Sequence, residues 1–329
     1  MEIQKKIHKH KDGLITGSLL FGPVLILIII LFITGPTQSP DNKPVSKKEV
    51  FKSFLSNNNT LTGHKEFPEV SLEAQSVIVK NLRTGEVLYE KDAYISMPLA
   101  SITKIMSAVT ARNIFKKDQN VQIQLADIAP EGDTALIVGE RWRLSKLLDF
   151  TLVGSSNDGA AAIANSAKRF LGKTEEPNSN ENPFVSEMNQ LADKLGMEKS
   201  YFRNETGLDT PAGVGGKGSA NDIAILYEYT LRHHPDLFEA TTADSFSVNT
   251  IDGNYHKINN TNEIVNQLPN LIGSKTGFTD LAGGNLAVVI DPSLNDPIAI
   301  VVLGSSRDGR FKDVKKLSDS VLEYLSEEE

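Results

Sequence analysis

The sequence predicts an α+β fold whose antiparallel sheet takes strands from both ends of the folded part of the chain. Three observations carry this prediction: strand-like apolar runs begin near residue 76, helical segments fill about 100 to 235, and strands return after about 270. A helical segment closes the chain. The order strands, helices, strands, helix is typical of a sheet covered by a helical cluster.

The first expected element is a transmembrane helix. Residues 14–34, LITGSLLFGPVLILIIILFIT, contain no charge and are long enough to cross the hydrocarbon core. A cleaved signal peptide is the alternative, but no alanine precedes Ala74 to form the usual cleavage site. The lysines before the segment keep residues 1–13 in the cytoplasm. We therefore expect a single-pass membrane anchor with the rest of the chain extracytoplasmic.

The remaining elements follow in order. Residues 35–69 are rich in Pro, Asn and Ser and lack sustained periodicity, which indicates an extracytoplasmic linker. Residues 70–329 form one predicted domain, which starts with a hairpin of strands 76–81 and 86–90 around a turn at 83–85. Its other expected elements are helices at 101–115, 144–153, 158–171, 183–196 and 220–234, and strands at 270–278, 283–291 and 297–306.

The last expected helix covers residues 311–325 and carries one apolar stripe. Apolar residues recur there at three- and four-residue steps, so the helix should pack against the sheet. The stripe consists of Phe311, Val314, Leu317, Val321, Leu322 and Leu325.

Composition excludes several classes of function. A net charge of -8 gives no basic surface for nucleic acid. The chain has no cysteine, which removes disulfides, thiolate nucleophiles and cysteine-based zinc sites. Its six histidines lack the H-E-x-x-H spacing of a metal-binding helix. Any nucleophile must therefore be an oxygen or an amine.

A first short motif, SITK, places Ser101 and Lys104 three residues apart, so on a helix they share a face. Pro98 suits the first turn of such a helix. A lysine can take the proton of a serine hydroxyl when burial or a nearby cation lowers its pKa. Alone the motif is weak, because a cap or a solvated pair has the same pattern.

Two further motifs add polar groups. In SSN, Ser155 can relay a proton to a leaving amine and Asn157 can hold a substrate amide, although such residues are also ordinary helix N-caps. In KTG, Lys275 and Thr276 would hold a carboxylate, and Gly277 lets a peptide approach the backbone. An edge-strand lysine followed by a turn is the alternative for KTG.

The three motifs together, in this order, resemble the motif set of penicillin-binding proteins and class A β-lactamases. Residues 70 to 326 resemble serine-type D-alanyl-D-alanine carboxypeptidases, which are low-molecular-mass penicillin-binding proteins. The stretches that carry the likeness are PLASITKIMSA, VGSSNDGAAAIA, FRNETGLD, GSKTGFTDLAGGNLAVV and VLGSSRDGRFKDVKKL. Ser156 departs from the pattern, because this family more often has glycine there. The resemblance implies a DD-peptidase/β-lactamase-like fold.

The resemblance also implies catalytic roles. Ser101 would attack the carbonyl of the penultimate D-alanine, with Lys104 as its general base. Ser155 and Lys275 would assist proton transfer to the leaving amine. The amides of Ser101 and Phe278 would form the oxyanion hole. Water would then hydrolyse the acyl-enzyme, so that neither a metal nor a cofactor is needed.

Substrate binding is implied at a second set of residues, namely Asn157, Thr276, Gly277, Phe278 and Arg310. Asn157 would orient the peptide, while Thr276 and Arg310, preferred over Arg307, would bind the terminal carboxylate. The implied partners are peptidoglycan stem peptides that end in D-Ala-D-Ala, and β-lactam antibiotics as covalent inhibitors. The expected location is a bacterial cell membrane.

Three alternatives remain open. An endopeptidase that cuts peptide cross-links would have the same motifs. A β-lactamase of class A would need a glutamate and an activated water, and we find no E-x-x-L-N stretch between residues 157 and 275. A membrane-tethered sensor would bind peptidoglycan, or be acylated, without turnover. The intact lysines and Ser101 argue against that sensor.

Overall fold

The computed structural model describes residues 66–115, 119–128, 136–172 and 182–326, all of which lie in one compact unit, Gly63–Glu329. The expected cytoplasmic segment 1–13, the anchor 14–34 and the linker up to residue 65 lie outside the described residues. Within these ranges, no helix combines the length and apolarity needed to cross a bilayer.

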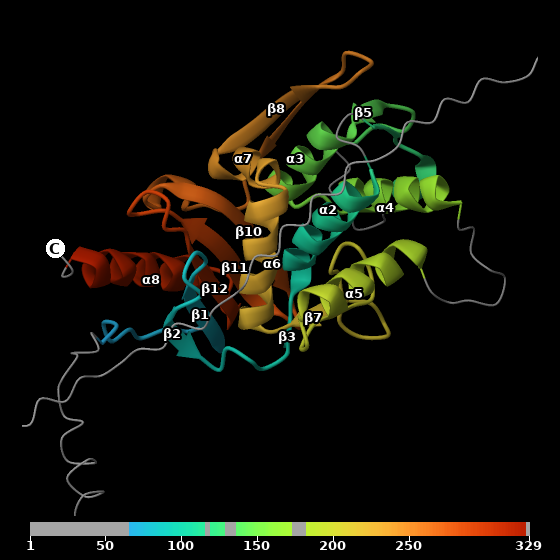
Figure 1. Cartoon of the computed structure of the whole chain (residues 1–329). Helices are drawn as coiled ribbons and strands as arrows, with labels where there is room; N and C mark the ends of the chain where they lie inside the picture. The colour runs from blue at the N-terminus through green and yellow to red at the C-terminus, as the bar shows by residue number, and fades with distance from the viewer. Residues whose placement is uncertain (1–65, 116–118, 129–135, 173–181, 327–329) are drawn as a thin grey trace, which may run out of the picture. The chain divides into compact units, whose positions relative to one another are not determined.

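A five-stranded antiparallel sheet lies at the centre of the domain, in the order β10-β11-β12-β1-β2 (Figure 1). The predicted hairpin is β1 (Ser76–Asn81) and β2 (Val87–Lys91). The returning strands are β10 (Leu271–Thr279), β11 (Gly283–Ile290) and β12 (Ile298–Ser305). β12 pairs with β1, with Ile78 opposite Val301. The sheet therefore takes strands from both ends of the domain, and the predicted α+β class is confirmed.

Both faces of this sheet are covered, which explains why β12 is buried along its whole length and apolar from Ile298 to Leu303. Val301 belongs to the core shared with the helical cluster, and Val302 belongs to the core shared with α8 (Gly309–Ser326). Figure 1 shows α8 on the opposite side of the sheet from α2 and α5. The predicted stripe packs on the sheet, except that Leu322 is 39% exposed. Leu322 directly follows Val321, so it points about 100° away from the stripe.

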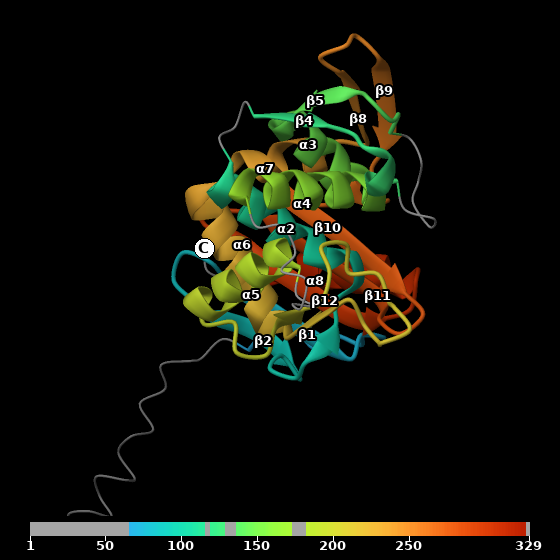
Figure 2. The ribbon, with the colours of Figure 1, turned by 90° about the vertical axis from the view of Figure 1, so that its right-hand side faces the viewer.

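The helical cluster contains the five predicted helices. They are α2 (Thr103–Ile114), α3 (Leu144–Gly154), α4 (Asn157–Leu171), α5 (Pro183–Leu195) and α6 (Ala220–His233) (Figure 2). Gly172 and Gly196 end α4 and α5 in the left-handed conformation that glycine adopts most readily. The five helices share one hydrophobic core with the sheet, and this core fixes the positions of the helices that carry the motifs.

Several short elements were not predicted. They are β3 (Met97–Pro98), β4 (Asn120–Gln122), β5 (Arg141–Arg143), β6 (Tyr201–Phe202), β7 (Gly216–Gly218), α7 (Asp236–Glu239), β8 (Ser245–Asn249), β9 (Tyr255–Asn259) and the 3-10 turns η1 (Ala100–Ile102), η2 (Leu125–Asp127), η3 (Ala240–Thr242) and η4 (Val265–Gln267). Most are too short to give a periodic signal, whereas β8 and β9 have 5 residues each, as many as the predicted β2, and were missed all the same.

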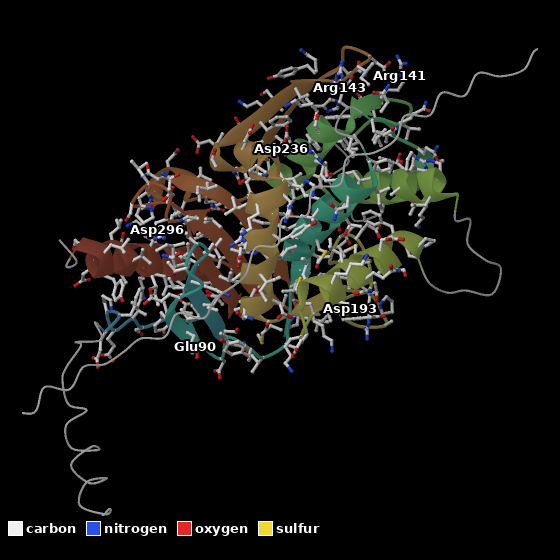
Figure 3. All side chains as sticks on the ribbon, in the orientation of Figure 1. Glu90, Arg141, Arg143, Asp193, Asp236 and Asp296 are labelled. Atoms are coloured by element: carbon white, nitrogen blue, oxygen red, sulfur yellow. The ribbon has the colours of Figure 1, made fainter. Side chains whose placement is uncertain are left out.

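The β8-β9 hairpin is tied to β5 by charged groups at the end of the domain where Figure 3 labels Arg141 and Arg143. Arg141 forms an ion pair with Asp252 at 2.6 Å. Beneath it, Glu140 and His256 are both buried, with Nε2 of the histidine 2.9 Å from Oε1 of the glutamate. These contacts fix the hairpin beside α3, whose C-terminal end leads to the second motif.

Candidate active site

Ser101 lies in a tight turn between a strand and a helix. Pro98 pairs with Lys217 in the β3-β7 ladder, the turn η1 covers Ala100–Ile102, and α2 begins only at Thr103. Ala100 has a φ of 47°, a left-handed conformation that is uncommon for residues other than glycine. The prediction that Pro98 belongs to the first helical turn is therefore wrong, because the chain reverses at Ala100 before the helix starts.

Lys104 is fully buried, and its amine contacts three oxygen atoms. Its Nζ lies 2.8 Å from Oγ of Ser101, 2.7 Å from Oδ1 of Asn157 and 2.9 Å from the carbonyl oxygen of Thr206. The carbonyl oxygen of Thr206 and Oδ1 of Asn157 can only accept hydrogen bonds from this amine, whereas the hydroxyl of Ser101 can also donate to it.

The second motif connects α3 to α4. Ser155 caps the end of α3 in the left-handed conformation, with a φ of 61°. Ser156 is buried and is the N-cap of α4, because its Oγ accepts a hydrogen bond from the amide of Gly159 at 3.0 Å. The departure at Ser156 thus has a local structural reason. Asn157 is the first residue of α4, and its side chain contacts Lys104.

The third motif lies on β10, which is an edge strand of the sheet, but Lys275 does not face solvent. It is 1% exposed, and its Nζ donates to Oγ of Ser155 at 2.9 Å and to the carbonyl oxygen of Thr276 at 2.9 Å. Burial, and to a smaller extent the cations Lys104 and Arg310, hold the pKa of Lys275 well below its ordinary value. The second and third motifs therefore meet.

Gly277 brings β10 against the nucleophile turn. A Cβ atom at this position would lie 2.8 Å from the carbonyl oxygen of Leu99 and 3.2 Å from the amide nitrogen of Ser101. Only glycine permits so close an approach of two backbones. The side chain of Thr276 contacts the hydroxyl of Thr261 at 2.6 Å. The two predicted oxyanion-hole amides thus lie on neighbouring segments of backbone, that of Ser101 in the turn and that of Phe278 in β10.

Arg310 joins the same strand from α8. Its Nη1 donates to the carbonyl oxygen of Gly277 at 2.7 Å, and its buried Nε has no hydrogen-bond partner within the described residues. Burial lowers the pKa of Arg310 and Arg307 adds to the effect, while nearby acidic side chains oppose it. The guanidinium of Arg307 lies 4.2 Å above the ring of Phe278. Two arginines at this end of β10 favour an anionic ligand.

Residues 62–307 match the peptidase S11 family, described as D-alanyl-D-alanine carboxypeptidase. The chain belongs to this family. The resemblance predicted from the motifs is therefore confirmed, and with it membership of a family of serine-type peptidases.

Relatives of this peptidase S11 chain support the assignment. D-alanyl-D-alanine carboxypeptidase DacF of Bacillus subtilis is 29% identical over 78% of this chain and 64% of its own length. The chain thus spans slightly less than two thirds of that relative. A D-alanyl-D-alanine endopeptidase of Pseudomonas aeruginosa is 29% identical over 75% of this chain and 76% of its own length.

A solved structure of the same fold is penicillin-binding protein D2 of Listeria monocytogenes in its ampicillin-bound form. It is 28% identical, covers 78% of this chain and 99% of its own, and superposes with a TM-score of 0.64. The DD-peptidase type of α+β fold predicted from the sequence is therefore confirmed.

Sequence reasoning missed several groups of this S11 site. The carbonyl of Thr206 contacts Lys104, and Asn204 holds the surrounding loop by accepting from the amide of Gly207 at 2.6 Å. Both lie in FRNETGLD, a stretch with no predicted role. Thr261 has no sequence signal, because a lone threonine in a loop has none. Within the described part of the chain, no group of three His, Cys, Asp or Glu side chains could hold a metal ion.

Proposed function

We propose that this protein is a serine D-Ala-D-Ala carboxypeptidase that removes the terminal D-alanine from peptidoglycan stem peptides through an acyl-enzyme at Ser101. One observation carries the proposal. The buried amine of Lys104 lies 2.8 Å from the hydroxyl of Ser101 and also contacts Oδ1 of Asn157 and the carbonyl oxygen of Thr206. Such an amine is oriented to accept the serine proton.

In the acylation step, Lys104 takes the proton of Ser101 while Oγ forms a bond to the carbonyl carbon of the penultimate D-alanine. The oxyanion that develops accepts hydrogen bonds from the amides of Ser101 and Phe278. Asn157 has its Oδ1 on Lys104, and its NH₂ group is the part of the side chain that can donate a hydrogen bond to the peptide.

In the second half of acylation, the C–N bond breaks and D-alanine leaves as an amine. Ser155 donates a proton to that amine and regains one from Lys104, which thereby returns to its neutral form, while Lys275, whose Nζ lies 2.9 Å from Oγ of Ser155, orients this hydroxyl. Water then attacks the ester carbonyl, gives a proton to Lys104, and releases the shortened peptide while Ser101 regains its hydrogen. Hydrolysis by this route requires no cofactor.

The terminal carboxylate of the substrate is bound at the end of β10. Arg310 is held there by the carbonyl oxygen of Gly277, and its guanidinium supplies a positive charge. Thr276, the residue before Gly277, adds a hydroxyl. This pairing of a planar cation with a hydroxyl suits a carboxylate.

We also propose that residues 14–34 anchor the enzyme in a bacterial cell membrane with the catalytic domain outside, since the segment is uncharged and preceded by lysines. β-Lactams would acylate Ser101 in the way of a substrate. The Listeria relative, solved with ampicillin, supports this inhibitor class.

A second candidate function is a DD-endopeptidase, favoured by the relative of that name in Pseudomonas aeruginosa. An endopeptidase cuts a bond whose amine side continues into another peptide. The two activities therefore differ in whether a free terminal carboxylate is needed next to Arg310.

The test is release of free D-alanine by the full-length protein in detergent from a pentapeptide that ends in D-Ala-D-Ala. Ser101→Ala is the control for the nucleophile. We expect release by the parent and none by the variant. Cleavage confined to a cross-linked dimer would favour the endopeptidase, rapid penicillin hydrolysis a β-lactamase, and acylation without any turnover a sensor.

A further inference from the structure

Asn285 is a fully buried polar residue of β11 that the proposed mechanism does not use. Its Nδ2 donates to the carbonyl oxygen of Pro98 at 2.9 Å, and its Oδ1 accepts from the amide of Gly304 at 2.8 Å. One side chain therefore connects the strand before the nucleophile turn to the end of β12. Most buried polar side-chain atoms have a hydrogen-bond partner, and both ends of the Asn285 amide have one.

The surroundings of Asn285 explain why a side chain is needed there. The register of β11 on β12 shifts between Gly284 and Leu286, so the ladder is interrupted beside Asn285. Gly304, in the same irregularity, has a φ of 68°. The side chain of Asn285 supplies the acceptor that the Gly304 amide requires, and its other end is directed at Pro98.

Asn285 also lies directly opposite Gly277 in the β10-β11 ladder. Gly277 contacts Leu99 and Ser101 from one side, and Asn285 holds Pro98, the residue before Leu99. Between these contacts lies Ala100 in its left-handed conformation. A strained residue of this kind persists only where its neighbours fix the chain on either side.

We infer that Asn285 is a positioning residue that sets the distance between the amides of Ser101 and Phe278. It acts through Pro98: without the hydrogen bond to the Pro98 carbonyl, the turn at Ala100 relaxes and the Ser101 amide moves away from β10. The inference rests on the proposed function, because it assumes that these two amides bind the developing oxyanion.

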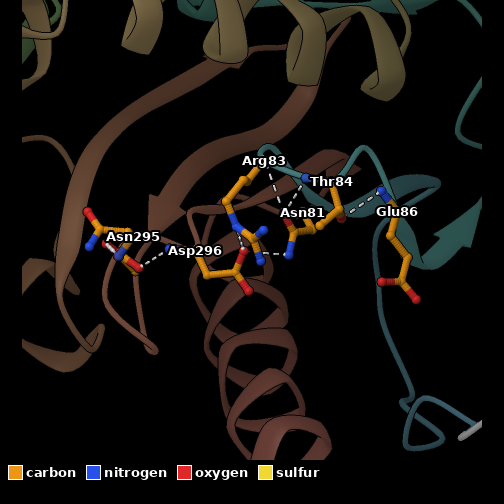
Figure 4. Close-up of polar contacts among 7 residues, drawn as sticks. Asn81, Arg83, Thr84, Glu86, Asn295 and Asp296 are labelled. Carbon is orange, nitrogen blue, oxygen red and sulfur yellow. Dashed lines mark hydrogen bonds and ion pairs between the residues drawn. The ribbon is translucent and has the colours of Figure 1, made fainter.

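The decisive variant is Asn285→Asp, which keeps the acceptor for Gly304 but replaces the donor to Pro98 with an oxygen. Asn285→Ser is a neutral second variant whose hydroxyl is too short to reach both partners. The matched control is Asn81→Asp, at the end of β1, where Asn81 pairs with Ile298, the first residue of β12. Asn81 is 5% exposed, its Nδ2 donates to Asp296 at 2.9 Å, and its Oδ1 accepts from the amides of Arg83 and Thr84 (Figure 4).

The measurement is the rate of Ser101 acylation by a fluorescent penicillin, expressed per active site from the burst amplitude, with the full-length protein in detergent. We expect both Asn285 variants to slow acylation by roughly 10- to 100-fold, up to the cost of a displacement of about 1 Å at the reacting centre. In peptide assays kcat should fall while KM is unchanged. Asn81→Asp should lower the thermal midpoint and leave the rate per active site at the parent value.

Other outcomes overturn the inference. If either folded Asn285 variant acylates at the parent rate per active site and only the amount of folded protein falls, Asn285 is merely structural. If the parent protein is not acylated at all, both the proposed role of Ser101 as nucleophile and the inference about Asn285 are refuted. If the parent is acylated but releases no D-alanine, the carboxypeptidase proposal fails, while the acylation rates still decide the role of Asn285.

Discussion

Replacing Gly277 with alanine tests the close contact between β10 and the nucleophile turn. The added Cβ would lie 2.8 Å from the carbonyl oxygen of Leu99 and 3.2 Å from the amide of Ser101. Both neighbours are backbone atoms, so neither can rotate away. One of the two backbones must move.

The size of the movement follows from these distances. Ordinary contacts of a Cβ begin near 3.4 Å, so the two backbones must separate by roughly 0.6 Å. Overpacking of this kind costs about 1–3 kcal/mol of the free energy of unfolding. A displacement of about 1 Å at a reacting centre can cost 100-fold in rate, so we expect Gly277→Ala to slow acylation by about 10- to 100-fold.

The assay is acylation by fluorescent penicillin, measured per active site, together with a thermal midpoint. Gly273→Ala is the matched control, because Gly273 lies four residues earlier on the same face of β10 and its added Cβ would meet the ring of Phe238 at 2.4 Å. It should destabilise the fold without slowing acylation. A folded Gly277→Ala protein with the parent rate would refute the proposed importance of this contact.

Two further predictions concern the cations of the site. Folded Lys275 releases its proton below its ordinary pKa of 10.5 while the unfolded chain retains it, so stability should rise with pH across that interval. Relative to Lys275→Met, the parent should therefore gain thermal stability as the pH rises toward 10.5, and a constant difference between the two midpoints would contradict a buried lysine with a lowered pKa. Arg310→Lys should raise KM by about 10-fold for a peptide with a free terminal carboxylate and leave KM for the same peptide amide nearly unchanged, because lysine cannot form the bidentate contact. Equal effects on the two peptides would place the carboxylate elsewhere.

Long, periodic elements of the fold could be predicted from the sequence, because burial imposes a pattern on them. The stripe on α8 and the apolar run of β12 are examples, since each follows directly from the face or faces that it buries. The turn at Ala100 could not be predicted. Nothing local favours a left-handed alanine, and contacts from β10 and β11 hold it there.

The site was predictable where three spaced motifs coincided and not where a backbone atom or a single side chain contributes. Ser101, Lys104 and Asn157 are brought together as the motifs predict. The Thr206 group in the site is a backbone carbonyl, which every residue has, so the residue type gives no signal. Asn285 lies in a strand where its neighbours are apolar. Residues of this second kind become visible only through their contacts.

The pairing of β1 with β12 has a consequence for how the protein is made. Ile78 and Val301 are neighbours in the sheet but about 220 residues apart along the chain. During synthesis the edge of β1 that pairs with β12 therefore has no partner until nearly the whole domain has been translated. This makes folding slow and the early chain prone to aggregation. The turn that carries Ser101 likewise acquires its contacts from β10 and β11 only at this late stage. A nascent chain thus lacks the assembled turn, and we expect the proposed reactivity of Ser101 to arise only with the completion of folding.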